Sequence, residues 1–494
     1  MIFQVATKTI KIGKSDPKPC WSKELNSKKH RLTRELRKPK KNRDRKKIKT
    51  LRAEYKAAIR RQQTKAKFQA TKKIKNDRTG RNMWRLVKNS AKSSSIFTTQ
   101  SKLTADNFAE AIQKNFIIPW EISEHYLDYV ESLLQCKEWL SSRFYPTTVI
   151  ELRSMKKFLK DNSPGIDGIP NSCLKKLLDD EPQILVDFVN AALAENTFPE
   201  ALKCGLVKAI PKPLDMDGKE QTPRPITLLP TTGKLLERIV AARLKDEMYR
   251  KGIQLNGQFG SRHGVAANDA LRSCLQIMKG TPGATIFLYL SKAFCTMVHA
   301  CLLFTMKEMG FSLHSQLFIH SYLSNRKLKT KCEEELSYEF TPQNGGPQGS
   351  VLPPLLFLIY IQPMLDALAQ YGGNIAAAYV DDIRVHIPSV GDSYEDGMNL
   401  QKILNVIQCE AKNLLLVFNP KKTKIIKHQK CKIKPPIFID KEIKFSKEVK
   451  YMGLLIDSRF TYSKATKILV EKWNAKSNQL RFLRSFLLRD KDKL

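Results

Sequence analysis

Two adjacent aspartates, Asp381 and Asp382, are the residues of this chain best placed to do chemistry. Short apolar runs flank them at 375–378 and 383–387, and the second run alternates as a half-buried strand does. The pattern predicts a hairpin with the acidic pair at its bend. Carboxylate oxygens presented by two strands are the ligands that Mg²⁺ prefers, so the pair is a candidate magnesium site.

Length and charge restrict what the rest of the chain can be. The chain has 494 residues and a formal net charge of +38, and 42% of its residues are hydrophobic. This length predicts roughly two to four domains, and the hydrophobic content is sufficient for packed cores. The first 90 residues hold 31 of the 86 Lys and Arg residues and only 6 of the 48 Asp and Glu residues. Such an excess favours a polyanionic partner, and nucleic acid is favoured over a membrane surface.

The cysteines and the apolar segments indicate where the protein works. The ten cysteines have no Cys-x-x-Cys spacing, which argues against structural zinc and favours reduced thiols in an intracellular protein of the nucleus or cytoplasm. The first 12 residues lack the apolar region of a signal peptide. The longest apolar stretch, Val351–Ile361, contains two prolines and is shorter than the ~20 residues of a membrane span, so no contact with a membrane is expected.

A basic segment precedes the globular part of the chain. Residues 21–88 are rich in helix formers with sparse apolar positions, which predicts one or two long charged helices. Two compatible interpretations remain open, a solvated and partly disordered arm or an arm that follows a nucleic-acid backbone. Residues 91–95 read as a linker, and from about Leu103 the composition becomes globular.

The globular part carries many short blocks in a fixed order. They are SPGIDGI at 163–169, TFP at 197–199, IPKP at 210–213, RPITLL at 224–229, GKLLE at 233–237, QFGSR at 258–262, FLYLSKAFCTMVH at 287–299, GPQGSVL at 346–352, FNPKKT at 418–423 and VKYMG at 449–453. With these blocks the chain resembles the reverse transcriptase region of a non-LTR (LINE-type) retrotransposon, from about Thr147 to about Tyr462. A lone Asp-Asp pair is a weak signal, whereas this many ordered blocks is a specific one.

The resemblance implies a fold, an activity and partners. The implied fold is an α+β right-hand polymerase with helical fingers, a palm built on a ferredoxin-like antiparallel sheet and a partial thumb. We expect a basic helical arm and linker over 1–102, fingers and palm over 103–460, and the start of a truncated thumb over 461–494. The implied activity is RNA-directed DNA polymerisation, with Mg²⁺, deoxynucleoside triphosphates, an RNA template and a DNA primer.

Residue roles carry over by position. Asp381 and Asp382 match the metal-binding pair, and Lys212 and Arg224 match cations that grip the triphosphate, although each alone is a surface cation by default. The other matched positions are Gln348 and Gly349 in a loop that lets template and nucleotide come close, Phe294 as a steric gate against a 2′-hydroxyl, Lys422 as a proton donor to pyrophosphate, and Tyr451, Met452 and Gly453 as the primer grip. Phe294 also reads as a core aromatic, and Lys422 as a solvated cation.

One block departs from the family's pattern. Where the family reads fLDLSKAFDtVnH, this chain has Tyr289 at the essential metal ligand and Cys295 at the supporting aspartate. A phenol ordinarily ionises near pH ~10, so tyrosine offers no charge at pH 7. Losing a bridging carboxylate that supplies ~4 kcal/mol lowers the rate ~1000-fold. Pro353, at a position where the family has glycine, is expected to strain a β-turn.

These departures predict a degenerate or fragmentary copy in which polymerisation is lost or very weak and nucleic-acid binding persists. No segment resembles an endonuclease domain, and the chain stops within the expected thumb. A different interpretation is a non-enzymatic RNA-binding protein that uses the basic arm and the old palm surface. A third is a decayed element with no function.

Overall fold

The fold was obtained as a computed structural model that describes residues 23–36, 44–75, 104–136, 143–160, 162–210, 224–262, 264–332, 335–372, 375–428, 433 and 435–488. The chain divides into two compact units. Among the described residues, the main unit holds 104–465, and the arm unit holds helices α2 and α3 together with the part of α17 (Ser463–Leu488) beyond Ala465. The expected mixture of helix and sheet is confirmed.

The arm unit contains two charged helices within residues 21–88, where the sequence predicts one or two. Helix α2 spans Lys23–Leu36 and α3 spans Arg45–Lys75. Leu25 and Ala58 are buried, and a carboxylate oxygen of Glu35 lies 3.9 Å from the Nζ of Lys47. Most of the other side chains described on α2 and α3 are exposed or half-buried, as expected for helices with few apolar positions. The linker expected at 91–95 lies outside the described residues.

The main unit alternates helices and short strands along the chain. Its helices are α5 (Ala105–Gln113), α6 (Glu124–Gln135), α7 (Val149–Met155), η3 (Lys156–Phe158), α8 (Asn171–Asp180), α9 (Pro182–Ala194), η4 (Glu200–Leu202), α10 (Thr231–Arg250), α11 (Ala267–Gly280), α12 (His299–Glu308), α13 (Leu313–Leu323), α14 (Leu352–Tyr360), α15 (Gln362–Ala369) and α16 (Ser393–Asn413). Its strands are β1 (Cys204–Ile210), β2 (Arg224–Leu228), β3 (Gly283–Tyr289), β4 (Lys327–Cys332), β5 (Glu335–Leu336), β6 (Ala376–Tyr379), β7 (Asp382–Pro388), β8 (Lys424–His428), β9 (Ile437–Phe438), β10 (Lys441–Glu442), β11 (Glu448–Tyr451) and β12 (Leu454–Asp457).

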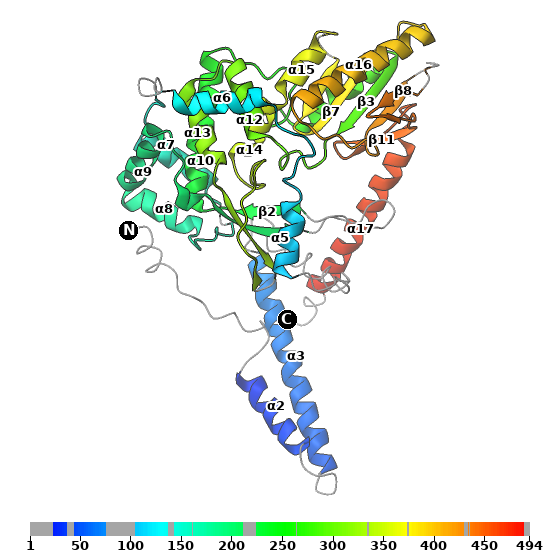
Figure 1. Cartoon of the computed structure of the whole chain (residues 1–494). Coiled ribbons are helices and arrows are strands. Elements are labelled where there is room, and N and C mark those ends of the chain that lie inside the picture. The colour runs from blue at the N-terminus through cyan, green and yellow to red at the C-terminus, as the bar shows by residue number, and fades with distance from the viewer. Residues whose placement is uncertain are drawn as a thin grey trace. The chain divides into compact units, whose positions relative to one another are not determined.

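Four strands form the large sheet, in the order β6-β7-β3-β8 with every neighbouring pair antiparallel. Helices α12–α15 connect β3 to β6, and α16 connects β7 to β8, which is the βαββαβ order of a ferredoxin-like sheet. Asp392 caps α16 by accepting hydrogen bonds from the backbone N–H groups of Tyr394 and Glu395, both at 2.8 Å. Figure 1 shows α15 and α16 beside this sheet.

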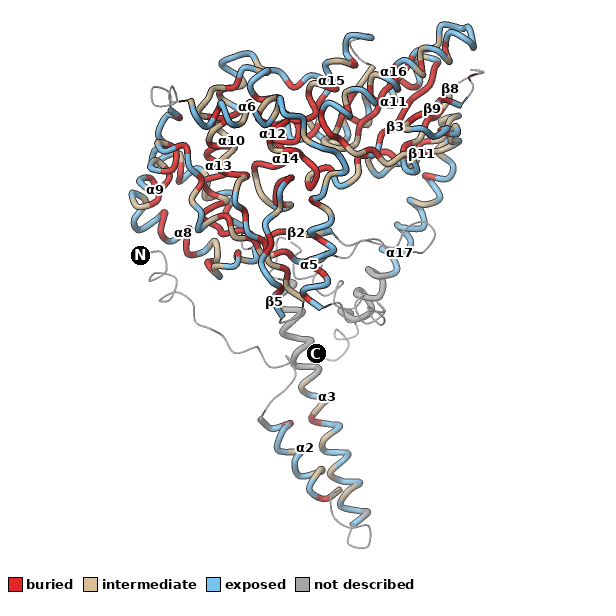
Figure 2. Tube along the Cα trace, viewed as in Figure 1, coloured by how far each residue is buried: buried red, intermediate tan, exposed pale blue. Residues whose placement is uncertain are grey.

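The central strand β3 is buried on both faces, which explains its continuous apolar sequence. Ile286 and Leu288 pack into the main hydrophobic core with helices such as α14. Phe287, on the other face, joins a second cluster with α11 and the hairpin of β11 and β12. Figure 2 shows the buried backbone concentrated along α14, β3 and their neighbours. The end of β3 is therefore held rigidly, and it is there that the strand reaches Tyr289.

A second sheet, here called the small sheet, also has four strands, in the order β2-β1-β4-β5. It has one covered face and one open face. Val207, Leu328 and Thr330 are buried on the covered face, where the hydroxyl of Thr330 donates to the backbone oxygen of Ala105 in α5. The alternate residues of the strands, such as Lys208 and Arg224, are exposed. The sheet thus presents cations to solvent while its other face packs against α5.

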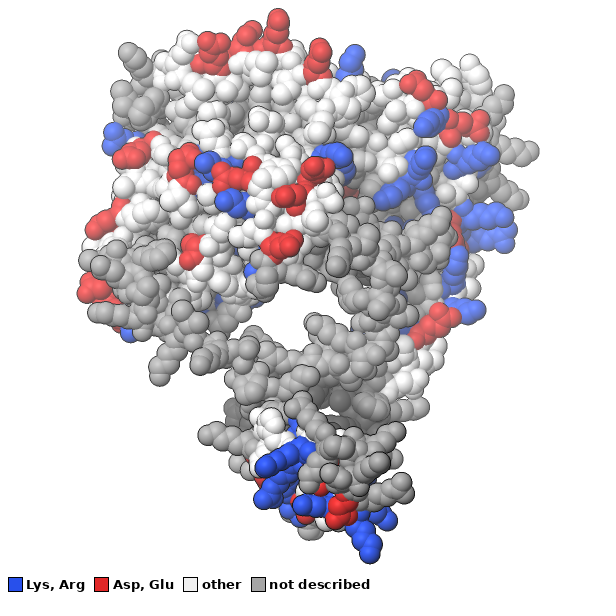
Figure 3. All heavy atoms as spheres, turned by 60° about the horizontal axis from the view of Figure 1, so that its bottom comes forward, with Lys and Arg blue, Asp and Glu red and all other residues white. Residues whose placement is uncertain are grey.

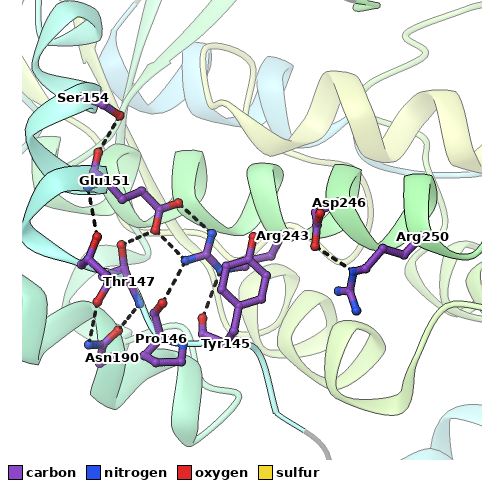
Figure 4. Close-up of polar contacts among 10 residues, drawn as sticks. Tyr145, Pro146, Thr147, Glu151, Ser154, Asn190, Arg243, Asp246 and Arg250 are labelled. Atoms are coloured by element: carbon purple, nitrogen blue, oxygen red, sulfur yellow. Dashed lines mark hydrogen bonds and ion pairs between the residues drawn. The ribbon is translucent and has the colours of Figure 1, made fainter.

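A buried arginine ties three helices together at one end of the main unit (Figure 4). Arg243 of α10 is 1% exposed, and its two terminal nitrogens each lie 2.7 Å from a carboxylate oxygen of Glu151 in α7. The Arg243 hydrogen bonds hold the pKa of Glu151 below its ordinary value. Thr147 links this pair to Asn190 of α9, whose side-chain oxygen accepts from the Thr147 backbone N–H at 2.7 Å.

The segment Leu352–Ala369 is the one part of the described chain long and apolar enough to cross a membrane by length and composition. It consists of α14 and α15, and 72% of it is buried inside the protein, as in a core helix. The expectation that Pro353 strains a β-turn is wrong. Pro353 lies in the first turn of α14, where proline's fixed φ is suited to a helix and its missing N–H costs nothing.

Candidate active site

The acidic pair lies where the sequence predicts, at the bend between β6 and β7. Tyr379 pairs with Asp382, so Val380 and Asp381 form a two-residue turn. Val380 has φ +61°, an unfavourable conformation for a β-branched residue, and such strain is often retained at functional sites. Gly260 approaches this turn so closely that an added Cβ would lie 2.5 Å from the Val380 side chain. Gly260 of the QFGSR block therefore packs directly against the hairpin turn.

Tyr289 is directly opposite Asp382 in the pairing of β3 and β7. Its ring is 38% exposed, and its backbone oxygen accepts a hydrogen bond from the N–H of Asn419 at 2.9 Å. The Asn419 turn places the Nζ of Lys422 4.4 Å from the centre of the Tyr289 ring, a cation–π distance. The position where the resemblance predicts a carboxylate is thus occupied by a ring with a lysine over it.

Burial controls the charge of the two aspartates. It raises the pKa of Asp382 to about 6, with a further contribution from Asp381. Burial also raises the pKa of Asp381, and the positive charge of Arg224 at the start of β2 partly opposes that rise. The structure therefore brings Arg224 within electrostatic reach of Asp381. Lys212, the other expected triphosphate ligand, lies outside the described residues.

The donor set does not fit a pair of divalent ions. Asp381 and Asp382 supply hard oxygen ligands, but the residue opposite them, Tyr289, is not a carboxylate. Within the described ranges no group of three or more His, Cys, Asp or Glu side chains is arranged to hold a metal ion. A reaction step through a two-metal centre is therefore not supported by the residues of this site.

The loop with the expected nucleotide contacts packs against β2. The backbone oxygen of Gln348 accepts from the N–H of Thr227 at 2.7 Å. Gly349 has φ +108°, and an added Cβ would lie 3.0 Å from the Thr227 oxygen, so this position requires glycine. Phe294 is half-buried and its ring lies 5.3 Å from that of Phe357, which agrees with a core aromatic at the edge of the site. The structure thus places Gln348 and Gly349 against β2, the strand that begins with Arg224.

Cys295 is 2% exposed in an apolar cluster with Val207, Leu328 and Phe340. The Nε2 of Gln348 lies 3.4 Å from its sulfur. Burial raises the pKa of the Cys295 thiol to about 11. The position assigned to a supporting aspartate therefore lies in an environment that disfavours an anion.

The expected primer grip is a tight turn. Met452 and Gly453 connect β11 to β12 with φ of +47° and +85°, the signs of the turn favoured in two-residue hairpins. The ring of Tyr451 packs at 5.2 Å from that of Phe287, next to β3. The turn is thus attached to the same sheet as the acidic pair.

Sequence reasoning gave no role to two residues that hold the site, Glu237 and His299. Glu237 ends the GKLLE block and His299 ends the FLYLSKAFCTMVH block. Glu237 is buried and His299 is half-buried, and both bond to the segment that carries Gln348. Their presence inside ordered blocks without an assigned role was the only available signal.

Known proteins with sequences similar to this chain include polymerases of mobile elements. The profile described as reverse transcriptase (RNA-dependent DNA polymerase) matches residues 210–456, half of the chain. The chain is 28% identical over 398 residues to the "Probable RNA-directed DNA polymerase from transposon BS" of Drosophila melanogaster, covering 77% of this chain and 43% of that protein. It is 27% identical over 406 residues to the RNA-directed DNA polymerase from mobile element jockey of Drosophila funebris, covering 78% and 43%.

The chain thus spans about two fifths of the length of the curated relatives it matches. A solved structure of apo telomerase from Candida tropicalis is similar over 52% of this chain and 54% of that chain, at 12% identity and a TM-score of 0.36. The resemblance to reverse transcriptases of non-LTR elements, inferred from the ordered blocks, is confirmed by the profile and the mobile-element relatives. The chain belongs to the reverse transcriptase (RNA-dependent DNA polymerase) family.

Proposed function

We propose that the main unit is the reverse transcriptase domain of a non-LTR retrotransposon, and that polymerisation in this copy is lost or very weak while template–primer binding persists. The observation that carries the proposal is Tyr289, which stands opposite Asp382 at the end of the central strand. Phosphoryl-type transfer depends mainly on charge placement, so one missing carboxylate removes a large share of the catalysis.

The parts of the polymerase follow from the two sheets. The ferredoxin-like order of the large sheet, with Asp381 and Asp382 at the turn that leads into its middle strand β7, supports its assignment as the palm. The small sheet, with Arg224 and the Gln348 loop beside it, is assigned to the fingers. Helix α17 is assigned as the start of the thumb. The boundaries at 102/103 and 460/461 stay predictions.

Several side chains have roles in substrate binding under this proposal. Arg224 grips the triphosphate, supported by its electrostatic interaction with Asp381, and Lys212 is assigned the same role from its place in the IPKP block. Gln348 and Gly349 contact the nucleotide and template, and Phe294 excludes a 2′-hydroxyl. Lys422 donates a proton to pyrophosphate, and the Tyr451–Gly453 turn presses on the primer.

A non-enzymatic RNA-binding function is the second candidate, and the distribution of charge favours it. Residues 421–465 carry 13 Lys and Arg residues against 4 Asp and Glu residues. Figure 3 shows Lys and Arg side chains gathered along one flank of the face it presents. A template–primer hybrid would be held there through phosphates and 2′-hydroxyls, without reading of base edges.

Primer extension on an RNA template with Mg²⁺ and deoxynucleoside triphosphates tests the proposal. We expect Tyr289→Asp to extend the primer at least ~1000-fold faster than the unaltered chain, because it restores a carboxylate opposite Asp382. Tyr289→Asn is the matched control, since it has nearly the same volume as the aspartate variant without its charge, and it should remain inactive.

Extension by the unaltered chain at a rate close to that of Tyr289→Asp would contradict the proposed loss of catalysis. If neither variant extends the primer but the unaltered chain binds the template–primer at nanomolar to micromolar concentrations, the RNA-binding candidate is favoured instead.

A further inference from the structure

The loop of residues 345–350, here called the Gly345–Ser350 loop, is held at its first residue by His299. The Nε2 of His299 lies 2.7 Å from the backbone oxygen of Gly345. A carbonyl can only accept, so Nε2 carries the proton and donates. Burial lowers the pKa of His299 to about 4, so the ring is neutral at pH 7 and keeps this donor.

Glu237 holds the other end of the same loop. This α10 residue is 1% exposed, and its Oε2 accepts from the backbone N–H groups of Val351 at 2.7 Å and Leu352 at 3.2 Å. It also accepts from the hydroxyl of Ser350 and, at 3.5 Å, from that of Tyr322. Val351 is the N-cap of α14 and its own side chain makes no capping bond, so Glu237 supplies from another helix the acceptor and negative charge that a helix N-terminus favours.

Between these two anchors the loop has little freedom. Gly345 has φ +74°, and an added Cβ would lie 2.4 Å from the Cys295 backbone oxygen. The N–H of Gly346 donates to the backbone oxygen of Phe294 at 2.8 Å, and the Thr227 N–H bonds to Gln348. The loop is thereby pressed between β2 and the segment that carries Phe294.

We infer that Glu237 and His299 are positioning residues for nucleotide and template binding, acting through the Gly345–Ser350 loop. This inference rests on the proposed function, because Gln348 and Gly349 have their roles only within it. Neither residue contacts the acidic pair in the contacts described, so their effect on nucleotide and template binding runs through the position of the loop. A purely structural role predicts lower stability alone, whereas a positioning role predicts weaker template–primer binding by a folded protein.

Hydrogen–deuterium exchange on the full chain tests the positioning step. We expect Glu237→Leu and His299→Leu to raise exchange in residues 345–352 and 224–228 ~10-fold, since each removes a buried hydrogen bond that anchors the loop. Glu237→Gln keeps an acceptor and His299→Gln keeps an N–H donor, so both should stay within ~3-fold of the unaltered chain.

Glu247 provides a matched control. It is buried on the same helix, α10, and caps α13 by accepting from the N–H of Ser312 at 2.6 Å and from the hydroxyl of Ser315. Glu247→Leu should lower the unfolding midpoint as Glu237→Leu does, without changing exchange in the Gly345–Ser350 loop.

Fluorescence anisotropy with a DNA primer annealed to an RNA template measures the consequence. The two leucine variants should bind ~10-fold more weakly, the two glutamine variants should recover most of the affinity, and Glu247→Leu should bind as the unaltered chain does. Unchanged loop exchange in both leucine variants, or an equal rise in Glu247→Leu, overturns the inference. Failure of the unaltered chain to bind template–primer, with loop exchange altered as expected, counts against the proposed function and leaves the anchoring of the loop supported.

Discussion

At the carboxylate hairpin a neutral ring stands opposite Asp382, whereas at the Gly345–Ser350 loop both anchors, the buried Glu237 and the half-buried His299, have their polar partners. The strand pairing is intact in the first region, running from Gly283 opposite Pro388 to Tyr289 opposite Asp382. Tyrosine is a favourable strand residue, so the sheet keeps its register, and under the proposed function a metal ligand is absent at this position.

The two regions differ in whether the interactions that stabilise the fold also include the groups proposed to act on the substrate. The hairpin is held by sheet pairing and the hydrophobic core, neither of which needs a charge at position 289. The loop is held by a few buried hydrogen bonds, and each one lost leaves an unsatisfied group. Substitutions in the first region should therefore change activity with little change in stability, while substitutions in the second should change both.

Cys295→Asp is expected to give the largest stability change, because it places a carboxylate in an apolar cluster next to the Gly345–Ser350 loop. The thiol lies in an apolar cluster, and burial already raises its pKa to about 11. We expect urea unfolding at pH 7.5 to give a free energy of unfolding lower by about 3 kcal/mol than for the unaltered chain. The loss should be smaller at pH 4.5, because burial raises the carboxyl pKa and the neutral acid then fits the folded state.

Cys295→Ala is the control for loss of the sulfur alone and should cost less. An aspartate variant as stable as the alanine variant at pH 7.5 would show that this pocket accepts an anion, and the contrast between the two regions would then be weaker. The same result would favour restoring both aspartates in the primer-extension assay.

The hairpin with its acidic pair and the strand ending in Tyr289 could be predicted because both follow from a local pattern of apolar and polar residues. The Met452–Gly453 turn was equally local. The contacts of Glu237 with the Gly345–Ser350 loop and α14 could not be predicted, because those partners lie more than a hundred positions further along the chain. Pro353 was misassigned to a turn because the sequence alone did not show that a helix begins at Leu352.

Three hydrogen-bonded polar side chains on neighbouring strands of the large sheet should make the stability of the protein depend on pH. The Thr285 hydroxyl lies 2.9 Å from Nδ1 of His386 and 2.9 Å from Nε2 of His428, and burial lowers the pKa of each histidine to about 4. The unfolded chain gains these protons as pH falls below about 6.5, while the folded chain stays neutral. Stability should be full above that pH and fall towards pH 4, by up to about 1.4 kcal/mol per pH unit for each histidine.

Guanidinium unfolding between pH 4.5 and 7 measures this slope. His428→Gln removes one titrating ring while its amide can still donate to Thr285, so the slope should fall by about one histidine's share. His30→Gln, at an exposed position on α2, is the control. A slope that does not change in His428→Gln would show that His428 does not contribute to the acid sensitivity.

The smallest effect is expected in the arm unit. It measures how much nucleic-acid binding comes from cations outside the carboxylate hairpin and the Gly345–Ser350 loop. Lys49, Arg52 and Lys56 are exposed at i, i+3 and i+7 on α3, so they lie on one face of the helix. Replacing all three by glutamine should reduce the slope of log affinity against log salt by ~2–3, as for three phosphate contacts, while Lys49→Arg with Lys56→Arg should keep it. Counterion release is independent of base sequence, so the change in slope counts the phosphate contacts that these three cations make. An unchanged slope would assign the phosphate contacts to other cations and remove α3 from the binding surface.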